Sequence, residues 1–154
     1  MSELEKVHIK LGISGTYWKK RPMYRVSFNG GIIKQAEITG KSDEVEYIEF
    51  DAEYTNDNVQ LQVQLLNKDS NDTVENADKT AILHDMLLNI VSLEIDEIDL
   101  GQIPFTDGVY TTDFDVVLNG KTTRTVRNCI NLGWNGTWEL VWTNPFYIWL
   151  LEKI

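Results

Sequence analysis

Apolar and polar residues alternate along most of the chain, and this period of two is typical of β-strands. The clearest case is residues 59–66, VQLQVQLL, in which every second residue is Val or Leu and the others are mainly Gln. This pattern predicts an antiparallel strand with one face in the core and the other in solvent. Comparable runs occupy residues 7–14, 23–28, 32–39, 45–54, 89–100, 111–118, 121–132, 136–142 and 145–154.

Turn signals separate several of these runs. Asn29-Gly30-Gly31 and Asn119-Gly120 each lie between two strand-like runs, and Asn-Gly is the strongest short signal for a β-hairpin. In residues 45–54 the alternation changes phase between Tyr47 and Ile48, which indicates a β-bulge. Both signals favour a meandering antiparallel arrangement.

The two later apolar runs carry further expectations. In residues 89–100, Val91, Leu93 and Ile95 are expected to share one face of a strand. The last run, residues 145–154, opens with Pro145, a residue that the first position of a strand tolerates. We therefore expect the chain to end in a strand.

About ten short strands predict an all-β protein, an antiparallel β-sandwich of the jelly-roll kind. Helix signals are weak, and we expect at most a short helix near residues 78–86, followed by strand. Without a repeat, linker or low-complexity segment, residues 1–154 are expected to form a single domain, in which residues 101–154 complete or extend the sandwich.

Composition excludes several partners. The net charge is −10, with 24 acidic residues against 14 basic ones, which argues against nucleic acid and against anionic membranes. No apolar run is long enough to span a membrane, and the N-terminus lacks the features of a signal peptide. We expect synthesis in the cytoplasm, with exit only inside a larger particle. The lone Cys129 excludes an internal disulfide and is expected to be buried and inert.

The segment between Asn67 and Asp85 is unusually rich in side-chain oxygen. Its acidic and amide residues are Asp69, Asn71, Asp72, Glu75, Asn76 and Asp78. Calcium takes six to eight oxygen ligands of this kind. The EF-hand pattern fails, because Val74 and Thr80 stand where Gly and Glu are required. Two interpretations remain open: a solvated acidic loop, or a calcium site of another type.

Catalytic and zinc patterns are missing from the sequence. His8 and His84 are far apart, and the grouped Cys and His residues of a zinc site are lacking. The chain contains no G-x-S-x-G, H-E-x-x-H or P-loop motif. We therefore expect a protein that is not an enzyme, with His84 in a packing role.

Aromatic residues offer a second candidate surface. Tyr17 and Trp18 lie in a polar, basic, turn-like segment, residues 14–22, where a ring can either stack on a sugar or partner protein, or pack. Trp138 and Trp142 share a strand face and are expected in the core, whereas Trp134 lies in the turn GWNG and can be exposed.

The order of elements in residues 7–100 resembles the calcium-dependent xylan-binding modules, carbohydrate-binding families 36 and 60. The shared elements are an alternating opening strand, YRVSFNG, IEFDAEY, VQLQVQLLNK, a long acidic loop and HDMLLNIVSLEID. Asn67 matches the Asn of an Asn-Asp pair that ends a strand in the family, and Asp85 matches the Asp that opens the next strand. Lys68 stands in place of the paired Asp, so one ligand is missing unless Asp69 or Asp72 replaces it. Asp96-Glu97 stands where Asn-Gly is usual.

A second resemblance covers both ends and the middle of the chain. KLGISGTYWKKRPMYRV, HDMLLNIVSLEIDEIDLG and LGWNGTWELVWTNPFYIWLLEKI are similar to segments of uncharacterised proteins of marine contractile-tailed phages that infect cyanobacteria. This resemblance implies synthesis in an infected host cell and association with the virion. It also fits a role in binding cell-surface polysaccharide.

Together the two resemblances imply a non-catalytic, calcium-dependent carbohydrate-binding protein encoded by a phage. In the family the calcium ion contacts sugar hydroxyls directly. The expected metal ligands are Asn67, Asp69, Asp72 and Asp85. The expected sugar-contacting residues are Tyr17, Trp18 and Asp78. The partners would be a polysaccharide or cell-surface glycan and virion proteins, and the aromatic tail suits self-association. The alternative is a structural virion protein that keeps the sandwich without binding sugar, which Lys68 supports because an ammonium repels a divalent cation.

Overall fold

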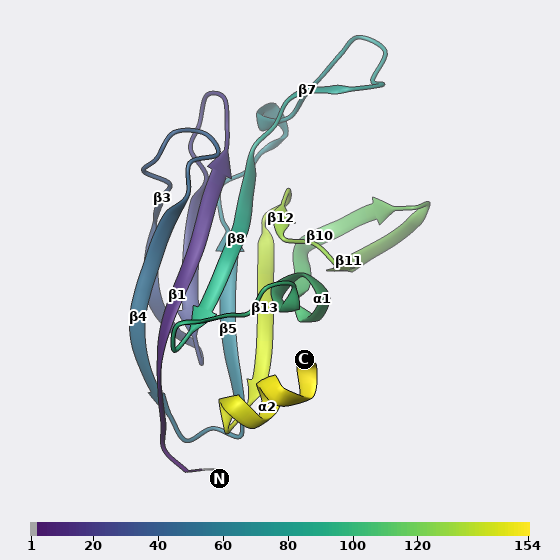
Figure 1. The fold of residues 1–154 in the computed structure, drawn as a ribbon. Helices are drawn as coiled ribbons and strands as arrows, with labels where there is room; N and C mark the ends of the chain where they lie inside the picture. Colours follow the sequence, from purple (N-terminus) through teal and green to yellow (C-terminus); the bar gives the residue numbers. More distant parts are fainter. Residues whose placement is uncertain (1–2) are drawn as a thin grey trace.

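The computed structural model describes residues 3–154, which form two antiparallel sheets packed face to face (Figure 1). The first sheet contains β1 (Glu5–Thr16), β4 (Glu46–Tyr54), β8 (Leu87–Ile95), β9 (Ile98–Asp99) and β12 (Asn131–Leu132). The second contains β2 (Met23–Phe28), β3 (Gly31–Glu37), β5 (Asn58–Leu65), β10 (Val109–Leu118), β11 (Lys121–Arg127) and β13 (Gly136–Thr143). The predicted all-β antiparallel sandwich is confirmed.

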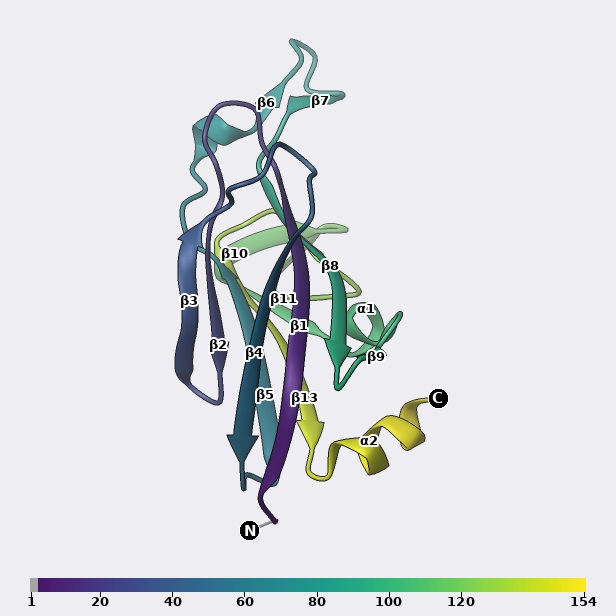
Figure 2. The same ribbon diagram turned by 60° about the vertical axis from the view of Figure 1, so that its left-hand side comes forward.

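The strand orders show that the two sheets are assembled from distant parts of the chain. The first sheet runs β12-β8-β1-β4, with β9 paired to β8, and the second runs β11-β10-β13-β5-β2-β3. In the view of Figure 2, β1 and β4 lie in front of β5 and β13. The C-terminal strand β13 is thus central in its sheet, between β10 and β5.

The core lies between the two sheets and is built from the alternating apolar residues. The inward side chains of three central strands are completely buried: Ile9, Leu11 and Ile13 of β1, Val59, Leu61, Val63 and Leu65 of β5, and Trp138, Leu140 and Trp142 of β13. Burying a side chain of this size stabilises the fold by roughly 1.5–3 kcal/mol. The predictions for residues 59–66 and for the two core tryptophans are confirmed.

Three hairpin turns use residues with a left-handed backbone. Asn29-Gly30 joins β2 to β3 with φ values of 48° and 84°, and Asn119-Gly120 joins β10 to β11 with 50° and 78°. Asp96-Glu97 makes the same type of turn between β8 and β9, with φ values of 52° and 66°. The backbone therefore keeps a conformation that favours Asn-Gly although neither residue is present there. Asp96 also accepts a hydrogen bond from the backbone N–H of His8 at 2.7 Å.

The expected bulge lies in a different strand. β4 pairs with β1 without a register shift, so the predicted bulge in residues 45–54 is wrong. The shift occurs where β1 meets β8: Gly12 faces Ser92 and Ile13 faces Ile90. Val91 is the extra residue and is 47% exposed, so the prediction that it shares the buried face of β8 is also wrong.

The chain ends in a helix, α2 (Phe146–Lys153), and the predicted final strand over residues 145–154 is wrong. A short apolar run fits a strand or a buried helix equally well. Here Phe146, Trp149 and Leu150 are buried, and their spacing of three and four residues defines one face of a helix. A second short helix, α1 (Ile103–Asp107), also lies in the part predicted to contain strands.

The acidic loop, residues 66–86, contains a 3₁₀ turn and a small hairpin. The 3₁₀ turn is η1 (Ser70–Asp72), and the hairpin pairs β6 (Val74–Glu75) with β7 (Ile82–His84). Residues 78–86 contain no helix, because a turn leads directly into β7. Among residues 3–154, no helix is long and apolar enough to cross a membrane.

The acidic loop lies at the same end of the sandwich as the β1–β2 and β3–β4 connections (Figures 1 and 2). In Figure 1 the β6–β7 hairpin projects beyond the sheets at the top, and the β10–β11 hairpin leaves the sandwich to the side. The N-terminus and α2 lie at the opposite end. The candidate residues of the acidic loop are therefore held at the end from which the β6–β7 hairpin projects.

Candidate functional site

Lys68 lies at the centre of the polar residues at this end. Its ammonium Nζ donates hydrogen bonds to Asp85 Oδ1 and to the backbone carbonyl of Gly133, both at 2.7 Å. The Lys68 side chain is only 12% exposed and that of Asp85 22%, so the pair is largely shielded from water. Three separate segments of the chain, after β5, before β8 and before β13, meet at this one ammonium.

Asp85 is held as a carboxylate. Its Oδ1 also accepts hydrogen bonds from Thr73 Oγ1 at 2.7 Å and from the backbone N–H of Met86 at 2.8 Å. Burial acts to raise the pKa of Asp85, but the hydrogen bonds from Lys68, Thr73 and Met86 outweigh it and lower that pKa below its ordinary value. Asp85 is therefore charged, and its charge is matched by Lys68.

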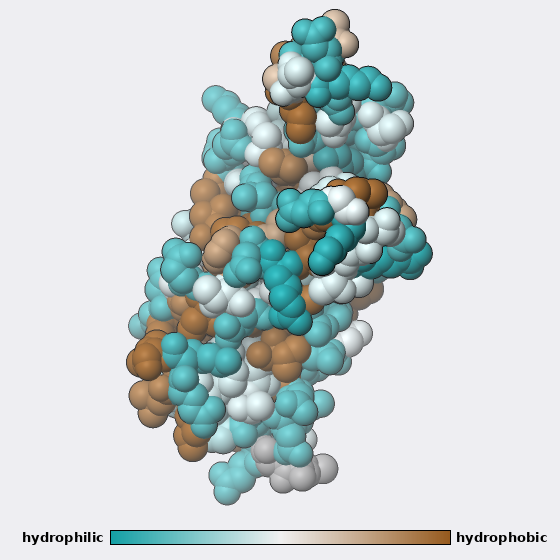
Figure 3. Space-filling model, turned by 90° about the vertical axis from the view of Figure 1, so that its right-hand side faces the viewer, coloured by the Kyte–Doolittle hydropathy of each residue, from teal (hydrophilic) through white to brown (hydrophobic). Residues whose placement is uncertain are grey.

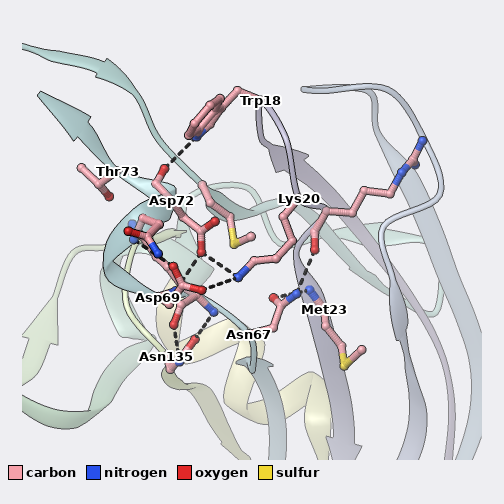
Figure 4. A network of polar contacts seen from close by, with 12 residues as sticks. Trp18, Lys20, Met23, Asn67, Asp69, Asp72, Thr73 and Asn135 are labelled. Carbon is pink, nitrogen blue, oxygen red and sulfur yellow. Dashed lines mark hydrogen bonds and ion pairs between the residues drawn. The ribbon is translucent and has the colours of Figure 1, made fainter.

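Asn67 and Asn135 fasten the acidic loop to its neighbours (Figure 4). Asn67 Oδ1 accepts from the backbone N–H of Met23 at 2.7 Å, and its Nδ2 donates to the carbonyl of Arg21 at 2.9 Å. Asn135 accepts from the backbone N–H of Lys68 at 2.8 Å and donates to the Lys68 carbonyl at 2.9 Å. The family resemblance implies that Asn67 is a metal ligand, but both polar atoms of its amide are hydrogen-bonded to backbone atoms.

Asp69 and Asp72 belong to a second charged group around Lys20. Lys20 Nζ lies 3.0 Å from Asp69 Oδ2 and 2.9 Å from Asp72 Oδ2. The two aspartates also form a capping box around η1, because Asp72 Oδ2 accepts from the Asp69 N–H at 2.8 Å and Asp69 Oδ1 accepts from the Asn71 N–H at 2.8 Å. The hydrogen bond from Lys20 lowers the pKa of Asp69, and the hydrogen bond to Asp72 raises the pKa of Lys20.

Tyr17 and Trp18 are committed to contacts within the protein. The Tyr17 hydroxyl donates to the Gly40 carbonyl at 2.8 Å, and the Arg21 guanidinium lies over its ring. Trp18 Nε1 donates to the Asp72 carbonyl at 2.9 Å, while its ring stacks on His84 at a centroid distance of 4.9 Å. Both rings therefore make packing contacts; because Trp18 is still 41% exposed, contact of this segment with a sugar stays a prediction.

Asp78 and His84 lie on the β6–β7 hairpin, away from Lys68. Asp78 is exposed in the turn at the hairpin tip, between Asn76 and Lys79. His84 is in β7 and packs against Trp18, in agreement with its expected packing role. The structure thus brings Asp85 next to Lys68, groups Asp69 with Asp72, and leaves Asp78 apart.

These side chains, as arranged, do not fit a calcium ion. Among residues 3–154, no three His, Cys, Asp or Glu side chains converge on a point where a metal could bind. Calcium needs six to eight oxygen atoms, and here two ammonium groups already occupy the cation-binding faces of the carboxylates. Asp72 Oδ1, which is buried and has no hydrogen-bond partner among the described residues, is a single oxygen and cannot supply such a set.

A hollow of about 390 Å³ opens beside Lys68. Two aromatic side chains line it, Trp134 of the loop before β13 and Phe114 of β10, which is 47% exposed. The backbone of Trp134 is fixed by Tyr110, whose hydroxyl accepts from the Trp134 N–H at 2.9 Å and donates to its carbonyl. The other lining residues are Lys68, Asp69, Ser70, Thr73, Gly133 and Asn135.

A second hollow, of about 650 Å³, continues from the first between the two projecting hairpins. The two share four lining residues: Lys68, Thr73, Gly133 and Trp134. Figure 3 views the molecule with the β10–β11 hairpin toward the reader and the β6–β7 hairpin above it. We call the two hollows together the cleft.

Cys129 lines the second part of the cleft. Burial raises the pKa of this thiol, so it is not an activated nucleophile.

Sequence reasoning did not find Phe114 or Asn135. By strand alternation Phe114 shares the face of Thr112 and Val116, both of which are buried. The pairing of β10 with β11 is interrupted between Thr111 and Val116, and this irregularity leaves Phe114 exposed. A break in pairing leaves no clear mark in a single sequence. Trp134 carried a weak signal, its place in the turn GWNG.

The comparisons with known proteins address the fold. No family model matches the chain, and no curated protein matches its sequence. The structure of vCBM60 in complex with galactobiose is similar, with a TM-score of 0.52, 11% identity, and coverage of 86% of this chain and 96% of that one. A selenomethionine form of vCBM60, described with a circular permutation that links two families of calcium-dependent carbohydrate-binding modules, gives a TM-score of 0.53 at 12% identity, covering 87% and 89%. At such low identity, this likeness shows that the chain has the β-sandwich fold of a carbohydrate-binding module.

Proposed function

We propose that this protein binds carbohydrate without catalysing a reaction on it, and that the sugar lies in the cleft against Trp134 and Phe114. The observation that carries the proposal is the hollow in which two aromatic rings face a set of polar side chains around Lys68. It lies at the loop end of a sandwich whose fold is similar to that of a module bound to galactobiose.

The chemistry of the cleft suits a sugar. A pyranose ring has an apolar C–H face, which packs on an aromatic ring, and a rim of hydroxyls, which need hydrogen-bond partners. Trp134 and Phe114 supply the apolar surface, while Asp69, Ser70 and Asn135 line the same hollow. Its volume, about 390 Å³, falls in the usual range for small-molecule sites.

Two of the three carboxylates that line the cleft, Asp69 and Asp85, support a non-catalytic role. A glycosidase needs two carboxyl groups across the scissile bond, one of which has a raised pKa so that it can act as the general acid. The pKa values of both Asp69 and Asp85 are instead lowered, through hydrogen bonds that include those from Lys20 and Lys68 respectively. Such carboxylates accept hydrogen bonds well but are poor proton donors at neutral pH.

Calcium dependence stays a prediction from the family resemblance. The likeness to a vCBM60 structure described with calcium-dependent modules supports it. The ion pairs of Lys68 and Lys20 weigh against it. Binding measured in calcium and in chelator decides the point, whatever the sugar.

The proposal is tested by retention on a panel of immobilised polysaccharides that includes galactan and xylan. We expect at least one to retain the protein, and Trp134→Ala to lose this retention. Phe105→Ala is the matched control, because Phe105 is 36% exposed on α1 and does not line the cleft. Retention of the Trp134 variant equal to that of the parent would contradict the proposed site. Release of reducing ends would contradict the non-catalytic role.

One observation favours the alternative, a structural virion protein. The exposed face of α2 carries Tyr147, Ile148 and Leu151, and Ile154 follows the helix; these four apolar side chains are 50–85% exposed. The helix lies at the lower left of Figure 3, where apolar side chains gather on the surface. Phage origin, association with a virion, synthesis in an infected host cell and self-association remain predictions. If no glycan is retained, binding to purified virion proteins becomes the next assay.

A further inference from the structure

The ammonium of Lys68 occupies a position built for a cation. Its two partners are a carboxylate oxygen and a backbone carbonyl oxygen, each 2.7 Å from Nζ. These are the kinds of oxygen that hard divalent cations take as ligands. Thr73 Oγ1 and the N–H of Met86 position Asp85 Oδ1 from the other side. A cation-binding arrangement is present, and the chain itself supplies the cation.

We infer that the Lys68 ammonium stands in place of a metal ion at this site, so that the parent protein binds no calcium there, and that Lys68→Asp turns the position into a divalent-cation site. The inference concerns metal binding and holds whether or not the cleft binds sugar.

The Lys68 ammonium and a metal ion cannot both occupy this position, because both are positively charged. An ion within a few ångströms of the Lys68 ammonium would be strongly repelled in this largely shielded position. The replacement removes one positive charge and adds one negative charge. The side chain becomes shorter, which leaves room for an ion between the new carboxylate, Asp85 Oδ1 and the Gly133 carbonyl. Thr73 Oγ1 and water can complete the coordination.

A consequence for ligand binding rests on the proposed function. An ammonium has three N–H donors, and two of those of Lys68 are used by Asp85 and Gly133. The third has no partner among residues 3–154, and Lys68 lines both parts of the cleft. It is available to a sugar hydroxyl, which assigns to Lys68 the direct contact that a bound metal would otherwise make.

The test is thermal unfolding in excess calcium and in excess chelator for the parent and for Lys68→Asp. We expect no calcium-dependent shift for the parent. We expect the variant to gain about 5–10 °C when calcium is 100-fold above its dissociation constant. Lys6→Asp is the control, because Lys6 also pairs with a carboxylate, that of Glu53, but lies in β1, is 69% exposed and does not line the cleft. It makes the same change in charge and should show no shift.

A calcium-dependent shift in the parent would overturn the inference, as would its absence in a folded Lys68→Asp. If that variant does not fold, Lys68→Asn repeats the test with a neutral oxygen ligand, and tryptophan-sensitised terbium emission reports metal binding directly. Lys68→Asn without metal binding would then also overturn the inference. None of these readouts involves sugar, so the outcome is independent of the polysaccharide panel.

Discussion

Trp18 stacks on His84, with the two ring centroids 4.9 Å apart and their planes inclined by 21°. The same indole donates its N–H to the Asp72 carbonyl at 2.9 Å. These two contacts join the loop between β1 and β2 to η1, which precedes the β6–β7 hairpin, and to β7, the second strand of that hairpin. Trp18 is therefore a support for the hairpin that forms one wall of the cleft.

Removing this support should reduce stability more than it alters the sugar site. Trp18→Ala loses an aromatic pair and one hydrogen bond, and we expect the free energy of unfolding to fall by about 1–2 kcal/mol. Urea unfolding measures this change. Trp18→Phe keeps the stacking and should recover part of the loss. Full stability of the alanine variant would show that the contact is incidental.

Asp85 should be more important for stability than an ordinary acidic loop residue. Asp85→Ala leaves the Lys68 ammonium, Thr73 Oγ1 and the Met86 N–H without their shared acceptor. We expect a loss of about 2–4 kcal/mol in the free energy of unfolding. Asp78→Ala, at the exposed tip of the same loop, provides the comparison and should change little. Equal effects of the two substitutions would contradict the central place given to Asp85.

The lowered pKa of Asp85 predicts a loss of stability in acid. Since its pKa in the folded state lies below the value of 3.8 for the unfolded chain, its contribution is complete above pH 3.8 and disappears as the pH falls through the folded pKa. Unfolding measured between about pH 5 and pH 2 should show this decline. Asp85→Asn should flatten it. An unchanged slope in the variant would assign the decline to other carboxylates.

Gly136 allows β13 to approach β10 closely. A Cβ at this position would lie 2.5 Å from the Thr111 carbonyl oxygen and 2.8 Å from Thr112 Cα, both backbone atoms of β10. We expect Gly136→Ala to cost about 1–3 kcal/mol and to weaken glycan retention, because β10 carries Phe114 into the cleft. Gly31→Ala is the control, with its nearest contact at 3.5 Å. If both substitutions have the same effect, the close approach is unimportant.

The sandwich could be predicted from the sequence because it depends on a local pattern. The alternation in β5 and β13 places Val63 and Trp138 on the inner face, and the Asn-Gly pairs mark two hairpins. The same approach gave the wrong element for residues 145–154, since an apolar run of that length is compatible with both strand and helix. The bulge at Val91 also escaped prediction, because register is decided by pairing with β1 and not by β8 alone.

The candidate site was only partly predictable, because its residues come together through contacts distant in sequence. The acidic loop was recognised as important, and Lys68 was recognised as a departure from the family pattern. The partners that decide their roles, Gly133 for Lys68 and Lys20 for Asp72, lie 65 and 52 residues away along the chain. Oxygen-rich composition alone cannot distinguish carboxylates that bind a metal from carboxylates paired with lysine.

The measurement that tests the central claim most directly is a two-dimensional ¹H–¹⁵N NMR titration with an oligosaccharide from the best-retained polysaccharide, in buffer with chelator. If sugar binds in the cleft, the resonances of the Trp134 indole and of the backbone amides of residues 68–73 and 133–135 will shift, and that of the Trp18 indole will shift little. Shifts confined to the outer face of either sheet, or no shift with any oligosaccharide of the panel, would contradict carbohydrate binding in the cleft.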